Sequence, residues 1–202
     1  MSSKKIGTIA IVIGVIAIVT SSVLLMRSIS EENTAIRHAE HAAEAFIDKI
    51  VNTSSSEQTP HDDVIVSEDG EEINIILIDD TAYMGVLTIP TLNLSLPVNA
   101  AWSYEALKST PCRFSGSIEN NTLVIMAHNY RGHFREIQSL ETGDIVTLTD
   151  TQGTEHIYQV VSIETMPPTE ANNVKHSNYD LTLFTCTNEG QARVVVRTMR
   201  VQ

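Results

Sequence analysis

An uncharged run of 21 residues, Ile6 to Met26, constrains this chain more than any other feature of its sequence. A helix that rises 1.5 Å per residue would be roughly 31 Å long over this run, close to a hydrocarbon core of about 30 Å. A cleaved signal peptide has a shorter apolar region of about 7 to 15 residues, followed by a small-residue cleavage site. Ser21 and Ser22 are small, but Val23 to Met26 continues the apolar run beyond them. The run therefore predicts an uncleaved helix that crosses the membrane once.

The charges beside this run indicate its orientation. Lys4 and Lys5 precede it, whereas only Arg27 follows it closely. Positively charged residues are retained on the cytoplasmic side of a membrane. We therefore expect a single-pass protein of the cell membrane, with its N-terminus in the cytoplasm and the remaining chain outside the cell.

The overall composition excludes several classes of protein. The chain has 13 Lys and Arg residues against 25 Asp and Glu, a formal net charge of -12, which argues against nucleic acid as a partner. Two cysteines are too few for a disulfide framework, and no clustered Cys/His spacing suggests a metal site. We expect neither a metal nor another cofactor.

The uneven charge divides the chain into three parts. Residues 1–27 have a net charge of +3, residues 28–82 have 14 acidic against two basic residues, and residues 83–202 have a net charge of -3. We therefore expect a cytoplasmic N-terminus and anchor at 1–27, a helical and then acidic, flexible stalk at 28–82, and a globular domain at 83–202.

Within the stalk, apolar residues recur at spacings of three and four from Glu31 to Asn52, which predicts a helix. His38 and His41 lie three apart on its polar side, where we expect a solvated face and not a metal site. Residues 53–72, rich in Ser, Asp and Glu, are typical of a flexible spacer. The apolar run Ile73 to Ile78 is compatible with a first strand or with a docking segment.

From Tyr83 onward, short β-like runs alternate with turn signals. Two short helices are expected near Ser103 to Leu107 and His133 to Ser139. At least seven strands with few helices indicate a mainly β fold, either a closed barrel or a nearly closed one. The predicted strands are Gly85 to Ile89, Leu92 to Val98, Leu123 to Met126, Ile145 to Leu148, His156 to Glu164, Leu181 to Thr185 and Arg193 to Met199.

Three reactive side chains lie at the ends of predicted strands. Cys186 directly follows Leu181 to Thr185, and His128 comes two residues after Leu123 to Met126. Arg193 opens the next β run, so a hairpin can place its guanidinium beside the thiol. Taken singly, each has an ordinary structural explanation, as a buried thiol, a satisfied histidine or a surface arginine.

In combination, four segments closely resemble the signatures of sortases, the membrane-anchored cysteine transpeptidases of Gram-positive bacteria. They are Tyr83 to Pro90, Ala127-His128-Asn129, the TLFTC element that ends at Cys186, and Arg193 to Val196. The resemblance covers residues 83–202. It implies a closed eight-stranded sortase-type β-barrel with short helices, preceded by the anchor and the stalk. Ala127 is one departure, because a glycine commonly precedes the histidine in sortases.

The resemblance implies that Cys186 is the nucleophile, His128 the general acid/base and Arg193 the group that steadies substrate and oxyanion. Arg197 is the alternative to Arg193, but it lies four positions and about 13 Å further along an extended strand. His133 is the alternative to His128. Cys112 could pair with Cys186 in an oxidising compartment, although a structural or incidental free thiol is the favoured interpretation.

The implied activity is cleavage of a sorting motif in secreted proteins, through a thioester on the cysteine, and transfer of the acyl group to an amine. That amine belongs to a cell-wall precursor or, in a polymerising enzyme, to a pilin lysine. Class B and class D sortases both remain open. Two alternatives are a noncatalytic barrel that binds peptides and a membrane-tethered cysteine protease that transfers the acyl group to water.

Overall fold

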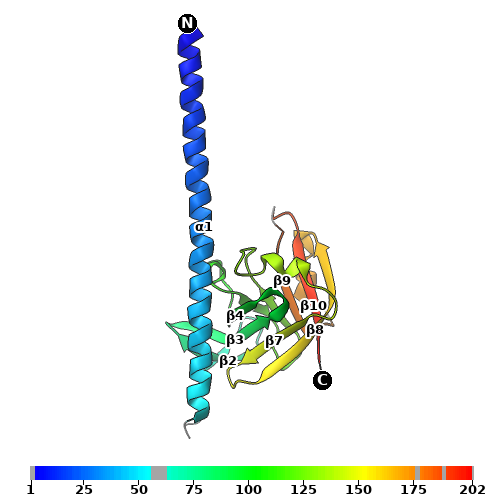
Figure 1. The fold of residues 1–202 in the computed structure, drawn as a ribbon. Helices are drawn as coiled ribbons and strands as arrows, with labels where there is room; N and C mark the ends of the chain where they lie inside the picture. Colours follow the sequence, from blue (N-terminus) through cyan, green and yellow to red (C-terminus); the bar gives the residue numbers. More distant parts are fainter. Residues whose placement is uncertain (1–2, 56–62, 176–177, 188–189, 202) are drawn as a thin grey trace.

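A long helix stands beside a β-barrel in the computed structural model of this chain (Figure 1). The structure describes residues 3–55, 63–175, 178–187 and 190–201. The barrel packs against the C-terminal part of the helix, whereas the N-terminal part of the helix projects well beyond it.

The helix α1 (Ser3–Ser55) joins the predicted membrane span and the predicted stalk helix without a break. Neither proline nor glycine occurs between Met26 and Glu31, so nothing in the sequence interrupts the helix there. Its N-terminal part is long and apolar enough to cross a membrane, and none of that apolar window is buried within the protein. The helix predicted from Glu31 to Asn52 is confirmed, and it continues directly from the span.

The C-terminal part of α1 buries a narrow stripe against the barrel. Ala35, Ala39, Ala42, Ala43 and Phe46 lie on this stripe, and Phe46 is fully buried. The four small alanines allow a close approach to the sheet, because a helix spaced by methyl groups can pack near its partner. Burial of a phenylalanine side chain contributes about 1.5 to 3 kcal/mol. The helix is therefore fastened to the barrel along this segment.

Eight strands form the closed barrel in the order β3-β4-β5-β6-β9-β10-β8-β7, and pairing between β7 and β3 completes the circle. Neighbouring strands are antiparallel except for the parallel pairs β4–β5 and β6–β9. The predicted closed eight-stranded barrel is thus confirmed. The strands are β3 (Thr81–Ile89), β4 (Leu94–Asn99), β5 (Cys112–Ser115), β6 (Leu123–Met126), β7 (Ile145–Asp150), β8 (Glu155–Met166), β9 (Leu181–Cys186) and β10 (Arg193–Arg200).

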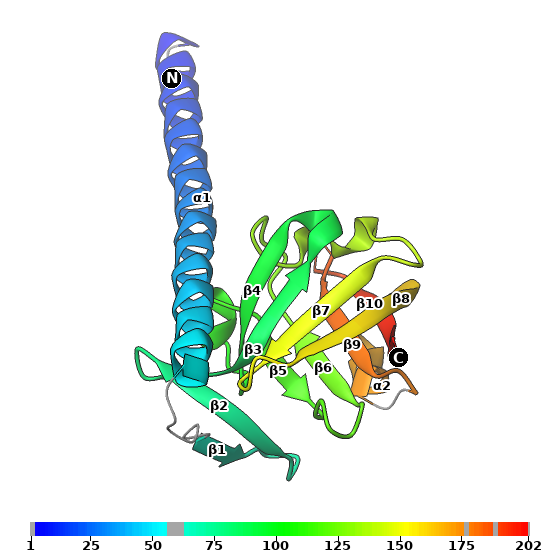
Figure 2. The same cartoon turned by 60° about the horizontal axis from the view of Figure 1, so that its bottom comes forward.

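Two further strands, β1 (Asp63–Val66) and β2 (Glu72–Ile78), form an antiparallel hairpin outside the barrel (Figure 2). The end of β2 pairs with the start of β3 across residues 76–83. The run from Ile73 to Ile78 is therefore a strand. The segment expected as a flexible spacer at 53–72 contains β1 and a turn in its described second half, while residues 56–62 lie outside the described part. The hairpin is held against the barrel by β2, whose Ile73 and Ile75 side chains are buried in the core.

Short helices connect the strands. The predicted helix at 103–107 overlaps the 3-10 helix η2 (Ala106–Lys108), and the one at 133–139 overlaps η3 (Arg135–Ser139). The 3-10 turn η1 (Pro90–Leu92) precedes β4, which begins later than predicted. Between β8 and β9 lie η4 (Pro168–Glu170) and α2 (Ala171–Lys175).

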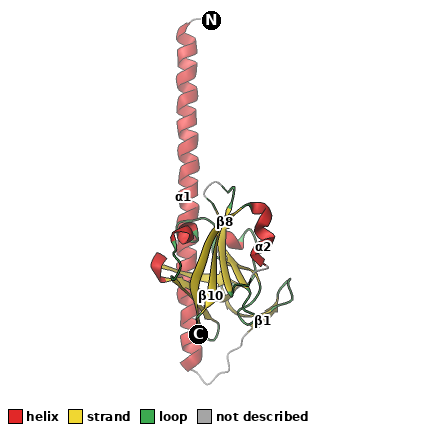
Figure 3. Cartoon of the chain, turned by 90° about the vertical axis from the view of Figure 1, so that its right-hand side faces the viewer, coloured by secondary structure: helices red, strands yellow, loops and turns green. Residues whose placement is uncertain are grey.

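One end of the barrel is turned toward the N-terminal half of α1, and the other end is turned away from it. Figures 1 and 3 both show α2 and the final residues of β8 at the end turned toward the N-terminal half of α1. The C-terminus of the described chain lies at the opposite end. Because Arg193 pairs with Met166 of β8, the start of β10 belongs to the first of these ends.

Candidate active site

Cys186 is the last residue of β9, and the sheet places it between two strands that carry the other candidates. On one side Arg193 of β10 is its direct partner in the antiparallel register. On the other side β6 runs parallel to β9, with Met126 opposite Phe184. Side chains alternate along a strand, so Cys186 and Phe184 point to the same, outer face of the barrel. The thiol is partly exposed.

The parallel register brings His128 next to Cys186. Two contacts continue the pairing beyond the end of β6: the Ala127 amide donates to the Phe184 carbonyl at 3.2 Å, and the Thr185 hydroxyl donates to the Ala127 carbonyl at 2.8 Å. His128 and Cys186 each lie two positions beyond the Met126–Phe184 pair, so they are on neighbouring strand ends. Neighbouring strands are about 4.8 Å apart. The predicted grouping of these strand ends is thereby present in the sheet.

The His128 ring is half-buried and packed against a tyrosine. It stacks on Tyr130 with ring centroids 4.8 Å apart and an interplanar angle of 24°. Burial lowers the pKa of His128 below its ordinary value of 6.5, and the positive charge of Lys108 lowers it further. The neutral imidazole, which accepts a proton, is therefore favoured at neutral pH.

Arg193 lies beside the thiol with few protein contacts. Its Nη1 donates to the carbonyls of Gly190 at 3.3 Å and Ala192 at 3.1 Å, both in the turn that leads into β10. The residue is only partly buried. Exposed turn carbonyls can exchange such hydrogen bonds with water or a ligand at small cost.

Arg197 is in a different environment, although it shares the outer face of β10. It is buried, its Nε donates to Glu164 Oε1 at 2.8 Å, and its Nη1 donates to the Val174 carbonyl and to Thr182 Oγ1. These contacts connect β8, β9 and α2 below the site. Arg197 is thus fixed within the fold.

His133 and Cys112 are both buried away from the surface. His133 lies behind Tyr130, with ring centroids 5.5 Å apart, and burial lowers its pKa to about 4. Burial raises the pKa of the Cys112 thiol to about 12. Cys112 and Cys186 are both free thiols. Neither buried residue is placed to contact a substrate.

An apolar floor extends from Cys186 along the outer face of β6, β9 and β10, and α2 covers part of it. Phe114 of β5 packs edge-on against Phe184 at 5.2 Å and also contacts Trp102 at 5.9 Å. Sequence reasoning missed this floor, although the alternation of Phe184 with Cys186 was a usable signal. The buried members of the cluster are Val124, Met166, Val174, Phe184 and Val195.

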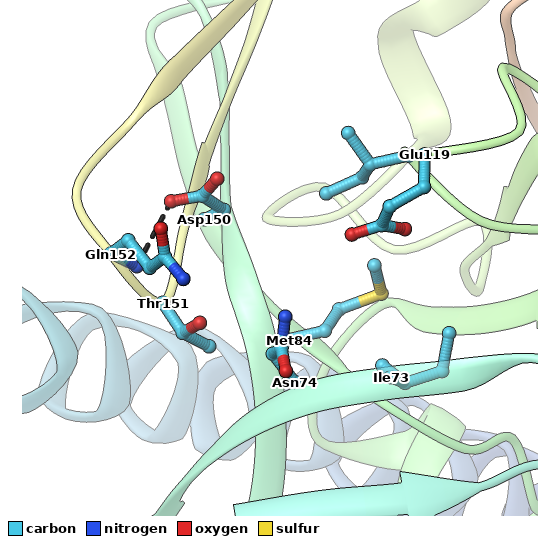
Figure 4. Close-up of a pocket in the computed structure, with 8 residues that line it drawn as sticks. Ile73, Asn74, Met84, Glu119, Asp150, Thr151 and Gln152 are labelled. Atoms are coloured by element: carbon cyan, nitrogen blue, oxygen red, sulfur yellow. Dashed lines mark hydrogen bonds between the residues drawn. The ribbon is translucent and has the colours of Figure 1, made fainter. Parts of the chain in front are cut away.

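No group of three or more His, Cys, Asp or Glu side chains able to hold a metal ion occurs in the described part of the chain. His38 and His41 are exposed on α1, and both line a cavity between α1 and the barrel. A smaller cavity of about 90 Å³ lies at the far end of the barrel, where Asp150, Thr151 and Gln152 face β2 (Figure 4).

The comparison with protein families shows which family this chain belongs to. A family model described as the Sortase domain matches residues 87–201, more than half of the chain. This chain belongs to the sortase family. A comparison with curated proteins returned no match.

Solved structures similar to this sortase share its fold. A sortase D5 transpeptidase from Clostridium perfringens is 18% identical with a TM-score of 0.56, over 86% of this chain and 99% of that one. The Group B Streptococcus Pilus Island 1 sortase C2 is 21% identical with a TM-score of 0.54, over 84% and 98%. Sortase A from Corynebacterium diphtheriae is 24% identical with a TM-score of 0.52, but the match spans only 60% of this sortase and 62% of that protein.

Proposed function

We propose that this sortase is a cysteine transpeptidase that cleaves a sorting motif in secreted proteins and transfers the acyl fragment to an amine of a cell-wall precursor. The observation that carries the proposal is the meeting of three strand ends: Cys186 pairs with Arg193 in β10, and the parallel register of β6 brings His128 to its other side. Both neighbours supply chemistry that a thiol nucleophile needs.

In the proposed first half-reaction, the thiolate of Cys186 attacks the scissile carbonyl. The N–H groups of Arg193 stabilise the charge that develops on the carbonyl oxygen, and the imidazolium of His128 protonates the amine that leaves. The partly exposed Phe114 and the exposed Trp102, which pack beside Phe184, support binding of the apolar part of an extended peptide. In the second half-reaction, neutral His128 accepts the proton of the incoming amine as the thiolate departs.

Burial of His128 has a consequence for this sequence of steps. Because its pKa lies below 6.5, the imidazolium needed for the first half-reaction is the minor form at pH 7. The neutral form needed for the second half-reaction is the major one.

The proposed organisation follows the charge division of the chain. Residues 1–27 form the cytoplasmic N-terminus and the anchor, residues 28–82 the stalk, and residues 83–202 the catalytic domain outside the cell. The unbroken apolar half of α1 supports membrane anchoring. Protease treatment of intact cells should digest the barrel and spare a tag at the N-terminus, whereas digestion of that tag would reverse the orientation.

The test of function uses the full-length protein and a library of sorting peptides, with and without amine acceptors. The expected products are a thioester on Cys186 and an amide with the acceptor, both identified by mass. A peptide amine related to cell-wall precursors and a lysine from a pilin peptide serve as competing acceptors. Preference for the lysine would indicate pilin polymerisation, and binding without a thioester would indicate a noncatalytic barrel.

A further inference from the structure

A cavity of about 460 Å³ lies between α1 and the histidine of the site. One wall is the segment of α1 that follows the membrane span, and the other includes the His128 loop. The cavity contains one glutamate, one lysine and several hydroxyl groups. Its lining residues are Ser30, Glu31, Thr34, Ala35, His38, Lys108, Ser109, His128 and Tyr130.

The two walls are fastened together by specific contacts. Arg135 forms an ion pair with Glu32 of α1 and also donates to the carbonyl of Asn129, the residue after His128. One helical turn further on, Ile36 packs so closely on Gly132 that a Cβ on this glycine would lie 2.1 Å from the isoleucine. These contacts hold α1 against the histidine loop, so the two segments enclose the cavity together.

The position of the cavity along α1 relates it to the membrane. Ser30 follows Met26 by four residues, which is roughly 6 Å of helix. Figures 1 and 3 show α2 at the barrel end that is turned toward the apolar half of α1, and the pairing of Arg193 with Met166 places the start of β10 at the same end. With the proposed anchor in the bilayer, the cavity lies just outside the membrane surface.

The lining carries one negative and one positive side chain, Glu31 and Lys108. Lys108 is paired with Glu105 at 2.8 Å, whereas Glu31 forms no ion pair among the described residues. Burial raises the pKa of Tyr130, and the negative charges of Glu31 and Glu32 raise it further, while the positive charge of Lys108 lowers it, so charges of both signs act on this wall of the cavity. An ammonium group bound near Glu31 would lie beside the imidazole that must take its proton.

We propose that this cavity binds the acceptor amine, with Glu31 holding its ammonium form. The inference rests on the proposed function. After the ammonium releases one proton to water, the amine attacks the thioester carbonyl of Cys186. A C–N bond forms, the C–S bond breaks, the sulfur leaves as a thiolate, and His128 takes the second proton. The products are an amide, a thiolate and an imidazolium.

The first experiment fills the cavity in the full-length protein. Thr34→Trp adds a large ring to the exposed α1 wall, and Asn33→Trp on the neighbouring helix position, outside the lining, is the matched control. Each protein receives a sorting peptide with glycinamide as acceptor, and amide and acid products are quantified by mass. We expect the amide-to-acid ratio to fall by about 10-fold or more in Thr34→Trp alone, because the amine loses its position. The rate of thioester formation should stay unchanged.

The second experiment tests the charge. Glu31→Gln should lower the amide-to-acid ratio with glycinamide by about 2-fold to 5-fold, the usual worth of an exposed ion pair. Hydroxylamine, which is uncharged at neutral pH, should react equally with both proteins. Glu44→Gln, on an exposed position of α1 outside this cavity, is the control.

Each result bears on one claim. A wild-type thioester with an unchanged product ratio in Thr34→Trp overturns the acceptor site alone. Slower thioester formation in that variant also overturns it, because the cavity would then hold the sorting peptide. Absence of any thioester on wild-type Cys186 overturns the proposed function, and the acceptor site with it.

Discussion

The outer face of β9 and β10 has two regions that use similar residues in different ways. At the site end, Cys186 and Arg193 are partly exposed, and the arginine contacts only carbonyls of its own turn. Further along the same face, Thr182 and Arg197 are buried, and Arg197 contacts three separate elements. One region is open to a ligand, and the other is closed by α2.

Partners, and not residue type, distinguish an arginine that is free to contact a ligand from one that is fixed within the fold. If the Arg197 guanidinium turned toward a substrate, the buried Val174 carbonyl and Thr182 hydroxyl would lose this donor, which costs about 1 to 3 kcal/mol for each buried group. Arg193 can exchange its turn carbonyls for a substrate at little cost. The four predictions below test this contrast between the open and the closed region.

The largest effect is expected at the proposed nucleophile, Cys186. Cys186→Ala removes the only proposed attachment point and should abolish the thioester and all turnover. Cys112→Ala should keep most activity, because this thiol is fully buried inside the sheet. Mass spectrometry of the trapped acyl-enzyme measures both. Turnover by Cys186→Ala, or a thioester found on Cys112, would contradict the assignment.

His128→Ala should lower turnover by about 10²-fold to 10⁴-fold, the usual contribution of a positioned acid or base. Without imidazolium, the leaving amine departs as an unstable anion. His133→Leu is the matched control, since that buried ring lies behind Tyr130 and is expected to affect activity little. Steady-state rates of folded protein make the comparison, and equal losses in the two variants would place His133 in the mechanism.

Arg193→Lys keeps the charge but loses the planar fork of donors, so we expect a loss of about 10-fold to 1000-fold if an oxyanion contact is removed. Arg197→Lys should change turnover little and instead lower the melting temperature, because the contacts to Glu164 and Val174 weaken. Rates and thermal melts of the same samples separate the two effects. An Arg197 variant that is fully stable but less active than the Arg193 variant would reverse the roles.

Strand ends were accessible to sequence reasoning because β-branched and apolar runs mark them. The positions of Cys186, His128 and Arg193 followed from where those runs stop, and the barrel followed from the number of runs. The strand β5 (Cys112–Ser115) was missed, since four residues after a proline show no alternation. The helix α2 was missed as well, because it is five residues long and depends on tertiary packing of Val174.

The packing of α1 against the barrel could not be predicted. Periodicity identified a helix from Glu31 to Asn52 but could not indicate what its apolar stripe covers. The contacts of Glu32 with Arg135 and of Ile36 with Gly132 join residues about 100 positions apart, and no local pattern encodes such pairs. The different burial of Arg193 and Arg197 could not be predicted either. Their even spacing predicted that they share one face of the strand, but the burial of Arg197 depends on its contact with α2.

The smallest predicted effect concerns stability in acid and comes from His133. Its pKa is about 4 in the folded protein against about 6.5 when exposed, because burial disfavours the charged ring. As pH falls below 6.5 the unfolded chain binds a proton that the folded chain resists, so stability is complete above pH 6.5 and decreases until about pH 4. Thermal melts should show a decrease of about 5 °C or more over this window in the wild type, and a shallower one in His133→Leu. Asp69 does not titrate within this pH window. Burial raises the pKa of its carboxyl, but hydrogen bonds from Arg113 and Ser67 outweigh burial and hold that pKa well below its usual range. Parallel curves for the two proteins would show that the buried ring is not the group that resists protonation beneath the site.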